Sequence, residues 1–259
     1  MLLIPYFLRI ILSILTFLSS LPQIQRIILK KSSADISLFY ILLNTISTTE
    51  QFTLGFFCII NHSYDSDFFV HDPRNLGDWL NLLQLIIVWL MSLILFALCL
   101  FYNPSNAPKG RVVALYVSFL FISVVPLFFD LSIPREGVDK EWYGALFYGI
   151  HSMYINPLIT LGGIAAFFFQ WQQAFALSSV GLAAQAFVFA AVALSWIARV
   201  QFIEMKRWGP DFPLKAWYQL VGWAAVNNGI FAIVQAALLY LSRRHHSRKS
   251  SEEEPLLSH

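Results

Sequence analysis

The sequence predicts an all-α integral membrane protein with seven transmembrane helices. Hydrophobic residues make up 58% of the 259 residues and charged residues only 12%, about half the charged share of a typical soluble domain. Seven mainly apolar stretches alternate with short polar breaks, and each can supply the roughly 20 residues that a helix needs to cross a bilayer. Lipid is therefore the expected main partner of this surface, and no separate globular domain is expected.

The apolar stretches place the expected helices along the chain. The first stretch has no basic leader and no small-x-small cleavage site, so we expect a helix there and not a signal peptide. Arg9 interrupts this stretch, and its long side chain is expected to reach toward the nearer interface. The expected helices span Leu2–Ile28, Ile36–Ile60, Trp79–Tyr102, Val112–Leu131, Trp142–Gln170, Leu177–Val200 and Ala216–Leu241.

Charge and one sequon orient these helices. An odd number of crossings places the termini on opposite sides, and a cytosolic C-terminus puts nine of the 17 Lys and Arg residues on the cytosolic side. Asn61 begins the sequon Asn61-His62-Ser63, which can be glycosylated only on the lumenal or external side. Both features predict a lumenal N-terminus, a cytosolic C-terminus and glycosylation at Asn61. The net charge of +2 is too small to indicate a nucleic-acid partner.

The C-terminal tail carries a possible sorting signal. Glu252 stands four residues before Leu256 and Leu257, and this spacing resembles the dileucine signal that directs membrane proteins to lysosomes or vacuoles. A cytosolic tail would present the signal to sorting adaptors. The alternative is a solvated tail that contains two leucines by chance.

The segment that joins the first two helices carries the most specific pattern. Pro22 and Gln23 lie near the end of the first helix, the basic turn Lys30-Lys31-Ser32-Ser33 follows, and Asn44 lies in the next helix. This pattern resembles the PQ-loop repeat family, which includes cystinosin and other lysosomal and vacuolar amino-acid exporters. The family is related in fold to the SWEET sugar transporters.

The resemblance implies a fold of two parallel three-helix repeats joined by a linker helix, in a 3+1+3 order. A degenerate second copy begins at Gln170, where Gln170-Trp171-Gln172-Gln173 precedes Ser178-Ser179, but the proline and the basic residues are absent. The resemblance also implies that Pro22, Gln23 and Gln170 act as gate hinges. The implied parts are a first repeat over 1–102, a linker over 103–141, a second repeat over 142–241 and a cytosolic tail over 242–259.

Glu50 is the strongest candidate for proton chemistry. It lies near the middle of the second helix, where Asn44, Ser47, Thr48 and Gln51 follow the i, i+3, i+4, i+7 spacing of one helix face. Polar side chains are costly in lipid, so this face is expected to line the bundle interior or a wet cavity. Asn44 and Gln51 are therefore candidate solute contacts and Glu50 a candidate proton carrier. The alternative for Glu50 is a structural carboxyl bonded to a neighbouring helix.

The fifth and seventh helices add further candidates. Imidazole is the side chain that ordinarily exchanges protons near neutral pH, so His151 could share proton transfer with Glu50, or it could be a packed hydrogen-bond donor. Asn156 precedes Pro157, which frees a backbone carbonyl where transporter helices often break to bind substrate, although a helix kink explains this proline equally well. By the family resemblance Asn228 is a solute contact, and the alternative is a polar contact between helices.

Together these features predict a vacuolar or lysosomal PQ-loop transporter that moves a small polar solute, such as an amino acid, by alternating access and with protons as the driving ion. The rival interpretation is a seven-helix trafficking or signalling receptor that transports nothing. The sequence contains no phosphate loop, no Gly-x-Ser-x-Gly and no zinc-binding His pattern. We therefore expect no enzyme activity, no metal site and no cofactor.

Overall fold

The computed structural model describes residues 4–60, 70–71, 73–103, 108–132, 138–199 and 214–253, and helices are the only regular secondary structure in these ranges. The described residues form seven long helical rods. The first four are α1 (Tyr6–Lys30), α2 (Leu38–Ile60), α3 (Leu76–Tyr102) and α4 (Lys109–Ser132). The fifth rod joins α5 (Val138–Ile150), η2 (His151–Ile155), α6 (Asn156–Gln170) and η3 (Trp171–Ala176). The sixth is α7 (Ser179–Arg199), and the seventh joins α8 (Leu214–Trp217), η5 (Tyr218–Gly222) and α9 (Trp223–Glu253).

Six of the seven rods are long and apolar enough to cross a membrane, and this confirms the predicted class. The exception is α2, which is 23 residues long. Its middle holds a run of polar side chains that lowers its hydropathy, although its length matches the bilayer. These side chains are Asn44, Thr45, Ser47, Thr48, Thr49, Glu50, Gln51 and Thr53.

Local signals explain where several helices begin and end. Asn75 and Asp78 form a reciprocal capping box that starts α3. The Ser178 hydroxyl accepts a hydrogen bond from the Gly181 N–H and so caps α7. Lys31 ends α1 in the left-handed conformation, with φ of 47°.

The expected end of the last helix at Leu241 is wrong. Helix α9 continues to Glu253, twelve residues further. No Gly or Pro interrupts this stretch before Pro255, so the backbone has no reason to leave the helix. Hydropathy finds only the part of a helix that is apolar enough for lipid, and the extension is polar.

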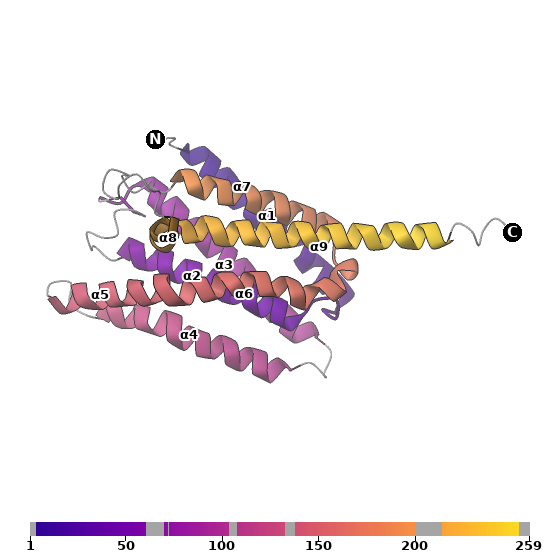
Figure 1. The fold of residues 1–259 in the computed structure, drawn as a ribbon, viewed down its shortest axis with the longest axis horizontal. Coiled ribbons are helices and arrows are strands. Elements are labelled where there is room, and N and C mark those ends of the chain that lie inside the picture. Colours follow the sequence, from indigo (N-terminus) through magenta and orange to yellow (C-terminus); the bar gives the residue numbers. More distant parts are fainter. Residues whose placement is uncertain are drawn as a thin grey trace.

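The helices pack in two groups. Helix α3 packs against both α1 and α2, and α9 packs in the same way against α6 and α7. Between the groups, α1 packs against α7 and α2 packs against α6. Helix α4 packs against α2 and α5 at the edge of the bundle (Figure 1).

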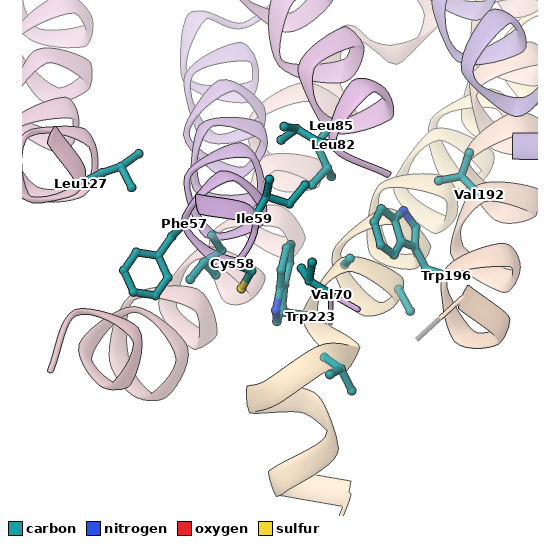
Figure 2. Packing of buried hydrophobic residues seen from close by; sticks show 14 of the residues in the cluster. Phe57, Cys58, Ile59, Val70, Leu82, Leu85, Leu127, Val192, Trp196 and Trp223 are labelled. Atoms are coloured by element: carbon teal, nitrogen blue, oxygen red, sulfur yellow. The ribbon is translucent and has the colours of Figure 1, made fainter. Parts of the chain in front are cut away.

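The two ends of the chain lie at opposite ends of the bundle (Figure 1), as an odd number of rods requires. We call the end where α1 begins the N-terminal end and the end from which α9 leaves the C-terminal end. Two buried apolar clusters fill the interior. One includes Cys58, Trp196 and Trp223, and Figure 2 shows Trp223 next to Cys58 and Val70. The other includes Leu42 and Leu238.

Candidate solute cavity and buried acid

A cavity of about 90 Å³ lies between the two groups of helices. Helices α1, α2 and α3 line one side, and α6, α7 and α9 line the other. The volume is enough for roughly six water molecules or a small solute. All the described lining residues are uncharged. The polar ones are Ser20, Gln23, Tyr40, Asn44, Thr45, Ser47, Thr48, Gln51, Ser92, Thr160, Gln185, Asn227, Asn228 and Gln235.

Helix α2 contributes more of this polar lining than any other helix. Asn44, Ser47, Thr48 and Gln51 all line the cavity, and these are the residues whose spacing predicted one polar helix face. The Thr48 hydroxyl lies 2.6 Å from the Ser92 hydroxyl, so α2 and α3 are joined at the cavity wall. The polar face of α2 therefore lines a cavity and not lipid.

Side chains of α9 donate hydrogen bonds to side chains of α2 at two positions along the cavity. Asn228 Nδ2 donates to Gln51 Oε1 at 3.0 Å, and Gln235 Nε2 donates to the Tyr40 hydroxyl. Asn44 Nδ2 and Gln235 Oε1 have no hydrogen-bond partner among the residues that the structure describes. One amide donor and one amide acceptor in the cavity wall are thus available to a solute.

Asn156 does not line the cavity but contacts Asn227, which does. Asn227 Nδ2 donates to Asn156 Oδ1 at 3.0 Å, and the Thr160 hydroxyl donates to Asn227 Oδ1 at 2.6 Å. Asn227 and Thr160 line the cavity, and Asn156 does not. Of the four expected solute contacts, the structure places Asn44, Gln51 and Asn228 in the wall, and it places Asn156 as a support for Asn227.

Glu50 lies on the opposite side of α2 from the cavity and is fully buried. Its Oε1 lies 2.7 Å from His151 Nδ1, and its Oε2 accepts a hydrogen bond from the Ser123 hydroxyl at 2.8 Å. The His151 ring is also buried and stacks on the Phe147 ring with 4.2 Å between centroids. The two expected proton carriers are thus hydrogen-bonded to each other, between α2, α4 and η2, and neither lines the cavity.

The helix that carries His151 is wound irregularly at that point. Residues His151–Ile155 form a π-helical turn, η2, in which the Asn156 N–H donates to the His151 carbonyl. Pro157 follows and begins the regular helix α6. A second π-helical turn, η5, contacts η2, and the Tyr148 hydroxyl donates to the Leu220 carbonyl inside it at 2.6 Å. Such turns often occur at functional sites inside membrane and soluble helices.

The three expected gate residues lie in the C-terminal half of the bundle. Pro22 interrupts the hydrogen bonds of α1 without ending the helix, and Gln23 lines the cavity. Gln170 is fully buried at the end of α6. Its Oε1 accepts from the Ser37 N–H and its Nε2 donates to the Asp35 carbonyl, both at 2.9 Å. Gln170 therefore caps the start of α2 from the other group of helices.

The Asp35 carboxylate forms ion pairs near the start of α2. It pairs with Arg26 at 2.7 Å and with Lys30 at 3.3 Å, and all three side chains are at least partly exposed. Screening by water makes such pairs weak. The buried Gln170 amide is thus the stronger link at this end of the bundle.

Several cavity residues gave no usable signal in the sequence. Ser20, Tyr40, Ser92 and Gln185 line the cavity. Tyr40, Ser92 and Gln185 each stand between apolar neighbours, and a single polar residue in a helix does not indicate what it faces. Asn61, Leu256 and Leu257 lie outside the described residues. Glu252 lies in the final turn of α9, and its side chain is not described.

A comparison with family models supports the resemblance for the first part of the chain. A family model described as a PQ loop repeat matches residues 4–66. This segment is a PQ-loop repeat. It contains the whole of α1 and α2, and so includes the expected gate residues Pro22 and Gln23, the polar face of α2 and Glu50. Comparisons with curated proteins and with solved structures give no match.

Proposed function

We propose that the protein is a vacuolar or lysosomal PQ-loop transporter that carries a small polar solute, such as an amino acid. The observation that supports this most is the position of the cavity. Its wall is shared by α1, α2 and α3 on one side and α6, α7 and α9 on the other. A site between two helix groups can open to either side of a membrane when one group rocks against the other.

We further propose that the two groups are the two repeats of a 3+1+3 fold. In each group the third helix packs against the first and the second. The contacts between the groups follow the same symmetry. Helix α1 packs against α7 and α2 packs against α6, so the first helix of each group packs against the second helix of the other. Two parallel repeats related by an axis along the membrane normal would give this pattern, with α4 as the linker.

The lining chemistry supports a polar solute without net charge. Amides and hydroxyls line the cavity together with apolar side chains such as Ile41, Met91 and Phe231, and the described part of the wall carries no ionised side chain. The unpaired Asn44 Nδ2 and Gln235 Oε1 offer one donor and one acceptor. A neutral solute or a zwitterion can use both without leaving a buried charge unpaired.

Helix α2 gives a route for proton coupling. Glu50 contacts His151 on one side of the helix, and the adjacent Gln51 contacts Asn228 on the cavity side. A change in the protonation of Glu50 alters the contact between α2 and η2. Because both residues belong to one rigid helix, such a change can shift the cavity wall.

The orientation and the organelle belong to the same proposal. The C-terminal end of the bundle carries Arg26, Lys30, Lys109 and Arg243, which favours a cytosolic position. The N-terminal end would then face the lumen, and the C-terminal tail would be available to sorting adaptors.

Solute flux in liposomes tests the proposal. The purified protein, reconstituted with a panel of labelled amino acids and sugars, should exchange at least one of them. Asn228→Leu should abolish this flux, because it removes the amide that joins α9 to Gln51. Asn103→Leu, at the end of α3 and outside the cavity, is the matched control. A correctly folded protein that exchanges none of the panel would favour the receptor.

A further inference from the structure

Two arginines are buried together at the N-terminal end of the bundle. Arg9, in the first turn of α1, is 5% exposed, and Arg199, the last residue of α7, is 4% exposed. Nη1 of Arg9 and Nη1 of Arg199 both donate to Asn81 Oδ1 on α3, at 3.2 and 3.3 Å. The expectation that Arg9 reaches out to the interface is therefore wrong, because α3 offers an acceptor inside the bundle.

The surroundings fix both guanidinium groups in place. A side chain on Gly77 would put its Cβ 2.5 Å from Arg9 Nη1, so the absence of a side chain there makes room for Arg9. The Arg199 guanidinium lies 5.0 Å from the centre of the Trp196 ring, and Arg199 Nη1 also donates to Gln84 Oε1. Residues from α1, α3 and α7 thus build one cluster.

This cluster has more donors than acceptors. Arg9 Nε, Arg199 Nε, Arg199 Nη2 and Gln84 Nε2 are four buried donors with no hydrogen-bond partner within the described part of the chain. The Asp78 carboxylate, one turn away on α3, attracts the Arg9 guanidinium electrostatically, but its oxygens accept hydrogen bonds from the backbone of His71 and Asn75 and from the His71 ring. Buried donors normally have an acceptor, and two like charges on one neutral oxygen repel each other.

The position of the cluster also favours an anion. A cation in the first turn of a helix meets the positive end of the helix dipole, which is unfavourable for Arg9. An anion beside Arg9 would be stabilised by that dipole and by both guanidinium groups, whereas the C-terminal end of α7, where Arg199 lies, favours the cation. The two guanidinium charges exceed the single charge of a carboxylate, and the six N–H bonds on these four donor atoms exceed its roughly four lone-pair sites, whereas a phosphate group offers more charge and more oxygens.

We propose that Arg9, Arg199 and Gln84 bind a phosphate oxyanion, either as the free ion or as the headgroup of an anionic lipid. None of the three lines the solute cavity, so this site is separate from the proposed transport site. The anion would bridge α1 to α7 and hold the two helix groups together at the N-terminal end of the bundle.

Thermal unfolding of the purified full-length protein in detergent tests this site. Inorganic phosphate is titrated at constant ionic strength against chloride. A ligand that binds only the folded state raises the unfolding midpoint, and we expect a rise of roughly 5 °C or more at a hundredfold excess over Kd. Arg9→Gln and Arg199→Gln should lose this rise. Arg243→Gln, an exposed arginine at the opposite end, should keep it.

A second variant protects the test against misfolding. Gln84→Met keeps the side-chain volume and both arginines but removes one free donor together with the Oε1 acceptor of Arg199 Nη1, so it should weaken phosphate binding while the protein stays monodisperse. The source of the oxyanion is separated in nanodiscs. The nanodiscs contain phosphatidylcholine with or without phosphatidic acid. If the site binds a lipid headgroup, phosphatidic acid should abolish the rise in unfolding midpoint that added phosphate causes. If the site binds the free ion, the rise should persist.

The proposal is overturned by either of two results. One is a midpoint that responds neither to phosphate nor to phosphatidic acid beyond the chloride control. The other is a response of full size in folded Arg199→Gln. Solute flux plays no part in this measurement, so its failure is distinct from a failure of the proposed transport function.

Discussion

His151 Nδ1 lies 2.7 Å from Glu50 Oε1, on the side of α2 that faces away from the solute cavity. The carboxyl is fully buried, and its other oxygen accepts a hydrogen bond from Ser123. An acid that does not touch the solute can still drive transport if the helix that carries it also forms the cavity wall. In the proposed transport cycle this arrangement would separate the solute from the proton, and α2 would be the element that couples them.

Glu50→Gln should uncouple transport from the proton gradient. Glutamine keeps the size of the side chain and can accept the Ser123 hydrogen bond, but it cannot bind and release a proton. We expect acid-driven accumulation in liposomes to fall to background while counterflow of solute at equal pH continues. Ser123→Ala, which removes one hydrogen bond and no titratable group, should leave accumulation largely in place. Uphill uptake of normal size in Glu50→Gln would contradict the role of Glu50.

Gly222→Ala should destabilise the seventh rod. A Cβ on Gly222 would lie 2.5 Å from Trp217 Cε3, so the indole or the π-helical turn must move. Overpacking of this kind costs about 1–3 kcal/mol, which should lower the unfolding midpoint in detergent. Gly149→Ala is the matched control because its Cβ meets nothing within 4 Å, and removing a helical glycine should raise stability by about 0.5–1 kcal/mol. Equal midpoints for the two variants would contradict this packing.

Gln170→Ala should loosen the C-terminal end of the bundle. It leaves the part-buried Ser37 N–H and Asp35 carbonyl without their partner. An unpaired group shut off from water costs about 1–3 kcal/mol, and one that water can reach costs less. Asp35→Asn breaks only exposed ion pairs, which are worth about 0–1 kcal/mol. Unfolding midpoints should therefore fall more for Gln170→Ala than for Asp35→Asn. The reverse order would show that the ion pairs, and not the amide, hold this end.

Replacing Leu256 and Leu257 by alanine should change where the protein is found in the cell. If the tail carries a dileucine signal, a tagged double variant should leave the vacuolar or lysosomal membrane and accumulate at the cell surface. Ser258→Ala, next to the leucines, is the control and should keep the normal location. An unchanged location for the double variant would show that these two leucines do not act as a sorting signal.

The sequence predicts a large part of this architecture because lipid imposes a simple rule. Every apolar stretch long enough to cross a bilayer became a helix, and the polar face of α2 with Asn44 and Gln51 lines a cavity as expected. The same rule indicated that Glu50 faces the interior. It could not indicate which neighbour Glu50 faces, because adjacent residues on a helix point about 100° apart. Gln51 therefore faces the cavity while Glu50 faces α4 and η2.

Contacts between distant segments account for most of what the sequence did not predict. Gln170 caps α2 across more than a hundred residues, and Arg9 meets Arg199 only through Asn81 on a third helix. No local pattern encodes such pairs. The extension of α9 to Glu253 was missed for a different reason, since hydropathy reports affinity for lipid and not helix propensity.

Access to the cavity from the two sides of the membrane tests the central claim most directly. Ser92 lines the cavity, and the native Cys58 and Cys99 are buried and should not react with a thiol reagent. Ser92→Cys therefore adds one reactive thiol in the cavity wall. A membrane-impermeant thiol reagent is applied to liposomes from each side in turn, with Ser123→Cys as a buried control outside the cavity. The account predicts that Ser92→Cys reacts from both sides and is protected by the transported solute. Reaction from neither side, or from one side only with no effect of solute, would contradict it.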